Sequence, residues 1–179
     1  YHNPEQKKTI QLGNGKLLSQ ATKKNVVYNF RSEDILNGGQ GAPLTPLFHR
    51  ALFQFKNISP PWIVLNIGGI SNITWCDSKL NFFAKDIGPG NCLIDEWIRE
   101  NTKFRIDKNG DFALAGKTDK IILEQALDRE MRYSNKKRSL DTNDYDLGFV
   151  RGLALEDGAA TLTEYTAEII SSNISSLFN

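Results

Sequence analysis

The sequence contains little of what marks several specialised classes of protein. Among its 179 residues are two cysteines, and no apolar run approaches the roughly 18 residues that span a bilayer. Cys76 and Cys92 lack the spacing of a metal site and fit reduced thiols better than a disulfide framework. The first residues, YHNPEQKK, are polar rather than signal-like. We therefore expect a cytoplasmic protein without a membrane partner.

The chain also lacks an excess of charge of one sign. Lys and Arg number 22 against 21 Asp and Glu, so neither nucleic-acid binding nor disorder is indicated. The length and the 40% of hydrophobic residues suggest one domain, or one domain and part of another. The sequence opens on Tyr1 and closes on an apolar helical pattern, so we expect a piece of something longer. Exposed apolar surface then favours self-association, for example as a homodimer.

Residue patterns predict the elements of the first third of the chain. Runs of β-branched and aromatic residues indicate strands at 9–12 and 25–30. Apolar residues with helical spacing between 44 and 55 predict a helix with one buried face. The prolines of Ser59-Pro60-Pro61 end this pattern, because two prolines in sequence cannot continue a helix. The predicted domains are residues 1–59 and 60–179.

Short strands followed by helices are expected after the two prolines. Residues 63–65 and 70–75 read as paired strands around two glycines, and residues 82–83 as a third, which predicts a small antiparallel sheet. A tight loop at 86–91 leads into a helix that Asn91 can cap. Later helices are expected at about 118–131 and 156–178. Together these elements predict an α/β fold with mixed sheets flanked by helices.

Three glycine-rich stretches stand out, GGQGAP at 38–43, NIGGISN at 66–72 and DIGPGN at 86–91. Backbone N–H groups in such turns can converge on an anion without a side chain in the way, and a helix N-terminus adds a favourable dipole. Each stretch has a structural alternative, namely a tight turn, a bulge or a capped strand-to-helix turn. Three together favour a phosphate site.

Polar side chains around these stretches could complete a reactive site. Asn72 and Asn91 can hydrogen-bond phosphate or sugar oxygens, and Asp86 could hold Mg²⁺ through water. Asp34 lies four residues before GGQG and is our candidate general base, with Arg31 near it to neutralise charge or bind a sugar. The alternative for Asp34 is a solvated loop carboxylate, as for most aspartates.

At this point four stretches of the sequence resemble the anhydro-N-acetylmuramic acid kinases. They are FRSEDILNGGQGAPLTPLFHRALF, WIVLNIGGISNIT, KDIGPGNCLIDEWI and IDKNGDFALAG, in this order. That family belongs to the sugar kinase, Hsp70 and actin superfamily, whose two lobes close on ATP. The resemblance covers essentially all of this chain but only the middle of the family's chain. It implies an incomplete ribonuclease H-like ATPase architecture, with residues 1–59 ending the N-terminal lobe and residues 60–179 beginning the C-terminal lobe.

The resemblance also implies a reaction in cell-wall recycling. Family members use ATP and water to convert 1,6-anhydro-N-acetylmuramic acid into N-acetylmuramic acid 6-phosphate, and Asp34 would take the proton of the attacking water. Positioning and charge neutralisation would supply the rest, as is usual in phosphoryl transfer. The implied substrate contacts are Arg31, Gly39, Gln40 and Gly41. The implied contacts to phosphate or ATP are Asn66, Gly68, Gly69, Asn72, Asp86, Gly88 and Asn91, with Mg²⁺ near Asp86.

The sequence also departs from the family pattern. The family's first phosphate loop, a Ser-Gly-Thr-Ser-x-Asp-Gly motif, and its later adenosine-binding segment are not found in these residues. Asn29 stands where many relatives have an Asp before Phe-Arg, which favours Asp34 as the base. Residues 136–139 (KKRS) replace a Pro-Pro-Lys-Ser motif, which predicts a less ordered loop.

Two interpretations stay open. The chain is either such a kinase or a non-catalytic remnant that binds the sugar weakly or not at all. A different sugar or acetate kinase of the superfamily is the weaker interpretation, because those relatives lack GGQGAPLTPLFH as it is written here.

Overall fold

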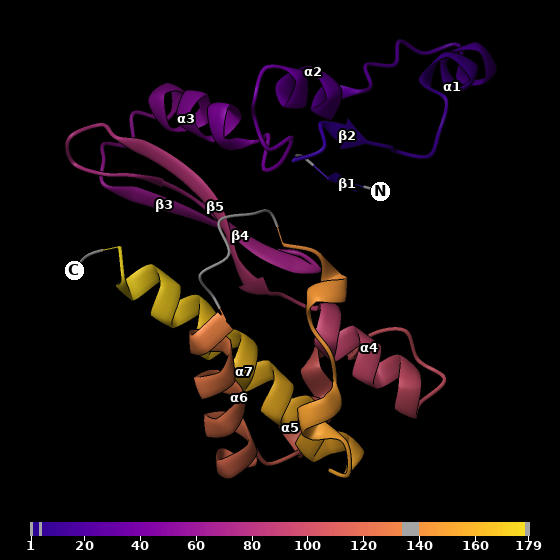
Figure 1. The fold of residues 1–179 in the computed structure, drawn as a ribbon, viewed down its shortest axis with the longest axis vertical. Helices are drawn as coiled ribbons and strands as arrows, with labels where there is room; N and C mark the ends of the chain where they lie inside the picture. The colour runs from indigo at the N-terminus through magenta and orange to yellow at the C-terminus, as the bar shows by residue number, and fades with distance from the viewer. Residues whose placement is uncertain (1, 4, 134–139, 178–179) are drawn as a thin grey trace. The chain divides into compact units, whose positions relative to one another are not determined.

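The computed structural model describes residues 2–3, 5–133 and 140–177. The chain divides into two compact units, residues 1–59 and 60–179, whose elements are labelled in Figure 1. The division coincides with the boundary expected at Ser59-Pro60-Pro61, whereas the assignment of the units to two kinase lobes stays a prediction. In the described ranges, no helix is both long enough and apolar enough to cross a membrane. Cys76 is buried, Cys92 is half-buried, and both are free thiols.

The first unit consists of short elements. They are β1 (His2–Asn3), β2 (Lys8–Thr9), α1 (Gly15–Thr22), α2 (Phe30–Leu36) and α3 (Pro46–Phe55). β1 and β2 pair antiparallel, so the strand predicted at 9–12 is present only at Thr9. The strand predicted at 25–30 is wrong, because residues 25–29 form no strand and Phe30 begins α2. The β-branched side chain of Val27 is 77% exposed, and strand propensity without a partner strand does not produce a strand.

The helix predicted at 44–55 is present as α3, but its buried face is not. The side chains of Leu47, Phe48 and Phe55 are 73%, 64% and 80% exposed. Apart from Pro46, Ile35 is the only buried aliphatic or aromatic side chain among the described residues of this unit. Helical spacing therefore predicted the helix correctly, whereas burial also requires a neighbouring element that covers the apolar face.

The second unit contains a three-stranded antiparallel sheet in the order β3 (Trp62–Ile67), β4 (Ile70–Cys76) and β5 (Phe82–Pro89). The predicted hairpin around Gly68 and Gly69 is confirmed. β5 is longer than the predicted third strand, because its pairing with β4 continues until Pro89 lies opposite Ile70. The prediction of a tight loop at 86–91 is therefore wrong for residues 86–89, which belong to a strand.

Helices build the rest of this unit around α7. They are α4 (Cys92–Asn101), η1 (Lys108–Gly110), α5 (Asp111–Ala115), α6 (Lys120–Tyr133), η2 (Thr142–Asp144), η3 (Gly148–Val150) and α7 (Leu155–Ser175). α7 contacts α4, α5, α6 and β5 (Figure 1). Its contact with α4 is close, since a Cβ on Gly158 would lie 2.4 Å from the Trp97 ring. On the sheet side, Ile170 packs with Ile73 and Ile87. α6 and α7 confirm the two helices predicted for this half.

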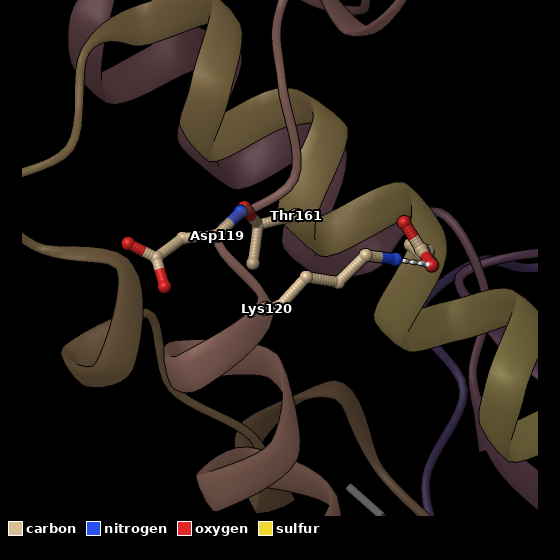
Figure 2. A network of polar contacts seen from close by, with 4 residues as sticks. Asp119, Lys120 and Thr161 are labelled. Carbon is tan, nitrogen blue, oxygen red and sulfur yellow. Dashed lines mark hydrogen bonds and ion pairs between the residues drawn. The ribbon is translucent and has the colours of Figure 1, made fainter.

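Polar contacts fasten the start of α6 to α7. Figure 2 shows Asp119 and Lys120 beside Thr161 of α7. The N–H of Asp119 donates to the Thr161 hydroxyl oxygen at 3.0 Å, and the Asp119 carboxylate accepts the N–H of Ile122 at 3.0 Å. Lys120 also forms an ion pair with Glu164. The residues 136–139, expected to form a less ordered loop, lie outside the described ranges.

Candidate functional site

Asp34 and two glycines of the GGQG stretch lie together in the first unit. Oδ2 of Asp34 accepts the N–H of Gly41 at 2.7 Å, and the Asp34 main-chain carbonyl accepts the N–H of Gly39 at 2.7 Å. A Cβ on Gly39 would lie 2.1 Å from Oδ2 of Asp34, and Gly41 has a φ of 68°. A side chain at position 39 would therefore displace the Asp34 carboxylate, and the φ of Gly41 is one that glycine adopts more readily than other residues.

The other residues predicted around Asp34 lie on α2 or in the loop that follows it. Arg31 lies on α2 one turn before Asp34 and is half-buried, whereas Gln40 is exposed. Asn29, which stands where many relatives have Asp, precedes α2 with a φ of 65° and accepts the Ser32 hydroxyl at 2.5 Å. Asn29 thus has a local structural contact at the start of α2. The roles of Arg31 and Gln40 stay predictions.

A row of polar residues crosses the sheet of the second unit. Asn66 of β3 lies opposite Asn72 of β4, and Asn72 lies opposite Asp86 of β5. Residues opposite one another share a face of the sheet, so these three side chains form one row. A β-bulge at this point leaves Ile87 out of the pairing and brings Asp86, rather than Ile87, opposite Asn72. The bulge therefore places residues of two glycine-rich stretches side by side.

The turn between β3 and β4 is bound to the start of α4 through main-chain atoms. The carbonyl of Gly68 accepts the N–H of Asn91 at 2.7 Å, and that of Gly69 accepts the N–H groups of Gly90 and Cys92 at 2.8 and 3.2 Å. These three N–H groups are thus used within the protein, and they do not provide the anion site expected of this helix N-terminus. A Cβ on Gly90 would lie 2.2 Å from the Gly68 carbonyl oxygen, so this contact requires glycine.

The remaining predicted residues of this region also have structural contacts. The sequence predicted that the Asn91 side chain caps α4, and this prediction is wrong. Its Nδ2 instead donates to the Ile67 carbonyl at 3.4 Å. Gly88 has a φ of 147°, and a Cβ there would lie 2.4 Å from the Ile169 side chain. Close packing and backbone conformation therefore explain Gly88, whereas its predicted contact with phosphate remains a prediction.

A turn at residues 140–144 was not recognised from sequence as part of this site. The N–H of Leu140 donates to Oδ2 of Asp86 at 2.9 Å. The Thr142 methyl group lies 3.5 Å from the position that a Cβ on Gly69 would take. The sequence does contain a sign of a turn here, the DTND pattern of residues 141–144. Its two aspartates, Asp141 and Asp144, form a capping box around η2. This pattern predicts a local turn but not the distant strand that the turn contacts.

Burial controls the titration of the groups beside the turn. Desolvation raises the pKa of the Cys92 thiol, which therefore stays protonated at neutral pH. Desolvation and then the Glu130 carboxylate raise the pKa of Tyr145 well above its usual value. Within residues 2–3, 5–133 and 140–177, no group of three or more His, Cys, Asp or Glu side chains could hold a metal ion. A metal near Asp86 would thus need water and phosphate oxygens as its other ligands, which suits Mg²⁺.

Comparison with known sequences accounts for this arrangement of stretches. The sequence profile described as anhydro-N-acetylmuramic acid kinase matches residues 1–178. The chain belongs to the anhydro-N-acetylmuramic acid kinase family. Its α/β fold is therefore an incomplete ATPase fold of the sugar kinase and actin type, as the resemblance implied.

Individual members of the anhydro-N-acetylmuramic acid kinase family show how much of a relative the chain represents. The protein of this name from Pelagibacter ubique is 52% identical over 177 residues, which are 97% of this chain and 47% of the relative. Those from Zymomonas mobilis and Methylorubrum populi are 41% and 39% identical, again over 97% of this chain and over 47% and 46% of their own lengths. The chain thus spans about half the length of the curated relatives it matches.

Proposed function

We propose that this chain is the central part of an ATP-dependent kinase that converts 1,6-anhydro-N-acetylmuramic acid and water into N-acetylmuramic acid 6-phosphate. The observation that carries this proposal is the Asp34 carboxylate held by the N–H of Gly41 within a chain of this family. The kinase would act in the cytoplasm during cell-wall recycling, on two small molecules and without a nucleic-acid or membrane partner.

Asp34 has the chemistry that the sugar half of the reaction needs. Its Oδ2 accepts the Gly41 N–H, so Oδ1 is the oxygen outside that bond and the candidate proton acceptor. Asp34 would take a proton from water while the water oxygen bonds to the anomeric carbon and the bond from that carbon to O6 breaks. The freed O6 would then attack the γ-phosphate of ATP, and ADP would leave. Arg31, Gly39, Gln40 and Gly41 would hold the sugar.

The turn at Gly68 and Gly69 supplies the candidate phosphate site of the second unit. Its two carbonyls are bound to the start of α4, which fixes the position of the turn. The row formed by Asn66, Asn72 and Asp86 would add amide and carboxylate groups beside the phosphates. Mg²⁺, where present, neutralises phosphate charge, and Asp86 would hold it through water.

The second candidate is a non-catalytic remnant that binds the sugar weakly or not at all. The observation that favours it is a departure from the family pattern, since residues 136–139 (KKRS) stand where relatives have Pro-Pro-Lys-Ser. A chimera separates the two candidates. In this chimera, the chain replaces the matching residues of the Pelagibacter ubique relative, and the relative's own residues before and after them are kept.

The measurement is ATP-dependent phosphorylation of the anhydro-sugar by the chimera and by this chain alone. We expect an active chimera in which Asp34→Asn lowers kcat by about 10²-fold or more, because general-base catalysis contributes about 10²–10⁴-fold. Glu33→Gln is the matched control, since Glu33 is an exposed neighbouring carboxylate on α2 and should leave kcat unchanged. An inactive chimera would favour the remnant, and an undiminished rate in Asp34→Asn would remove Asp34 as the base.

A further inference from the structure

The turn at residues 140–144 is held together by its own side chains. Oδ1 of Asp141 accepts the main-chain N–H of Asn143 at 3.0 Å and the Asn143 side-chain amide at 2.8 Å. In return, Oδ2 of Asp144 accepts the N–H of Asp141 at 2.9 Å. These bonds close a capping box, so the turn keeps its shape without a ligand.

Asp86 anchors this turn to the sheet. Its Oδ2 accepts the N–H of Leu140 at 2.9 Å, across 54 positions of the sequence. Asp86 itself is fixed on β5 opposite Asn72, and the C-terminal side of the turn leads to Tyr145, which packs against the buried core. The turn is thus tied at its first residue to the polar row and at its far side to the core.

The anchored turn reaches the glycine pair. The Thr142 methyl group lies 3.5 Å from the position that a Cβ on Gly69 would take, so an added methyl group would just touch it. Gly69 is therefore bound to the start of α4 through its carbonyl, and Thr142 of the 140–144 turn lies beside it, with room for one methyl group between them. Without the bond from Leu140 to Asp86, the position of Thr142 beside Gly69 would depend on the core side of the turn alone.

We propose that Asp86 is a positioning residue, which holds the 140–144 turn beside Gly69 by accepting the N–H of Leu140 and so fixes one wall of the phosphate site. This inference rests on the proposed function, because only there do Gly68 and Gly69 bind phosphate. Positioning the turn and holding Mg²⁺ make different demands on the Asp86 side chain. An acceptor oxygen is sufficient for positioning, whereas binding a metal also uses the negative charge.

The first test measures hydrogen exchange at the Leu140 amide by NMR in this chain. Asp86→Ala removes the acceptor, and we expect the Leu140 amide to exchange about tenfold faster or more, as for the loss of one hydrogen bond to a charged group. Asp86→Asn keeps a carbonyl oxygen and should stay within about threefold of the unmodified chain. Asp95→Ala, in the first turn of α4, is the control for losing a carboxylate nearby. Unchanged exchange in Asp86→Ala, or equal acceleration in Asp86→Asn, would overturn the proposal.

The second test measures KM for ATP and kcat in the chimera. We expect Asp86→Ala to raise KM for ATP about tenfold or more, because it removes both the acceptor of the Leu140 N–H and the carboxylate proposed to hold Mg²⁺ through water. Asp141→Ala loosens the same turn without touching Asp86 and should also raise KM. An unchanged KM for ATP in Asp141→Ala would show that the position of the turn does not affect ATP binding and would overturn the proposal. If the unmodified chimera does not phosphorylate the sugar, the proposed function fails, and Leu140 exchange still decides the positioning role.

Discussion

Gly90 shows at the scale of one residue how the site depends on main-chain contact. Its N–H donates to the carbonyl of Gly69 at 2.8 Å, and a Cβ at this position would lie 2.2 Å from the Gly68 carbonyl oxygen. Such a distance requires the β3–β4 turn and α4 to separate. Because a displaced turn would also lose its hydrogen bonds to Asn91 and Cys92, a single methyl group affects the whole junction.

We therefore expect Gly90→Ala to lower the free energy of unfolding by about 2 kcal/mol or more, as for overpacking against a rigid neighbour. The matched control is Gly68→Ala, because a Cβ there would lie 3.5 Å from the nearest atom, the Ile70 carbonyl oxygen. This variant should lower the free energy of unfolding by less than about 1 kcal/mol. Urea unfolding followed by tryptophan fluorescence measures both. Equal stability of the two variants would contradict the close contact at Gly90.

Single residues also differ in how far the sequence predicts them. The association of Asp34 with the GGQG stretch could be predicted, because a separation of seven residues between Asp34 and Gly41 keeps both in one local turn. The bond between Leu140 and Asp86 could not, because it joins residues 54 positions apart. The bond also depends on the β-bulge that brings Asp86 opposite Asn72. The sequence does not show where such a bulge interrupts the pairing of two strands.

At the scale of elements, periodicity predicted α3, α4, α6 and α7 and the β3–β4 hairpin. It failed where tertiary contacts decide. β5 continues through glycine and proline to Pro89 because β4 offers it a partner, while residues 25–29 are rich in strand formers but form no strand. The same dependence applies to helix positions, since α6 and α7 are joined by specific side-chain bonds that periodicity does not specify (Figure 2).

The contact between α6 and α7 gives a prediction of its own. Thr161 is fully buried, accepts the N–H of Asp119 at 3.0 Å and donates to the Asp157 carbonyl at 2.7 Å. We expect Thr161→Val to lower the free energy of unfolding by about 1–3 kcal/mol, because the Asp119 N–H loses its partner. Thr163→Val is the control, since Thr163 is exposed and its hydroxyl bonds only within α7, to Ala159. Urea unfolding measures both, and equal losses would mean that the contact between the helices contributes nothing beyond helix propensity.

At the scale of the whole molecule, the two units differ in what they bury. Seventeen of the eighteen buried hydrophobic side chains of the described residues lie after Ser59, and the exception is Ile35. Ordering the backbone costs about 1–2 kcal/mol per residue, which buried apolar surface must offset. Residues 60–179 have a continuous core around α7 for this purpose, whereas the exposed face of α3 provides none.

This asymmetry predicts that residues 60–179 fold without residues 1–59. We expect the isolated segment to unfold cooperatively in urea, with a free energy of unfolding within about 1 kcal/mol of that of the whole chain. In the whole chain, amides of α1, α2 and α3 should exchange with solvent much faster than those of α4 and α7, because local stability follows burial. Residues 1–59 alone serve as the control and should show no cooperative transition. Slow exchange throughout α3, or loss of cooperative unfolding in residues 60–179, would mean that the first unit contributes to the core after all. The expected result would instead place Asp34 in a segment of low intrinsic stability, so that its geometry depends on the local bonds to Gly39 and Gly41.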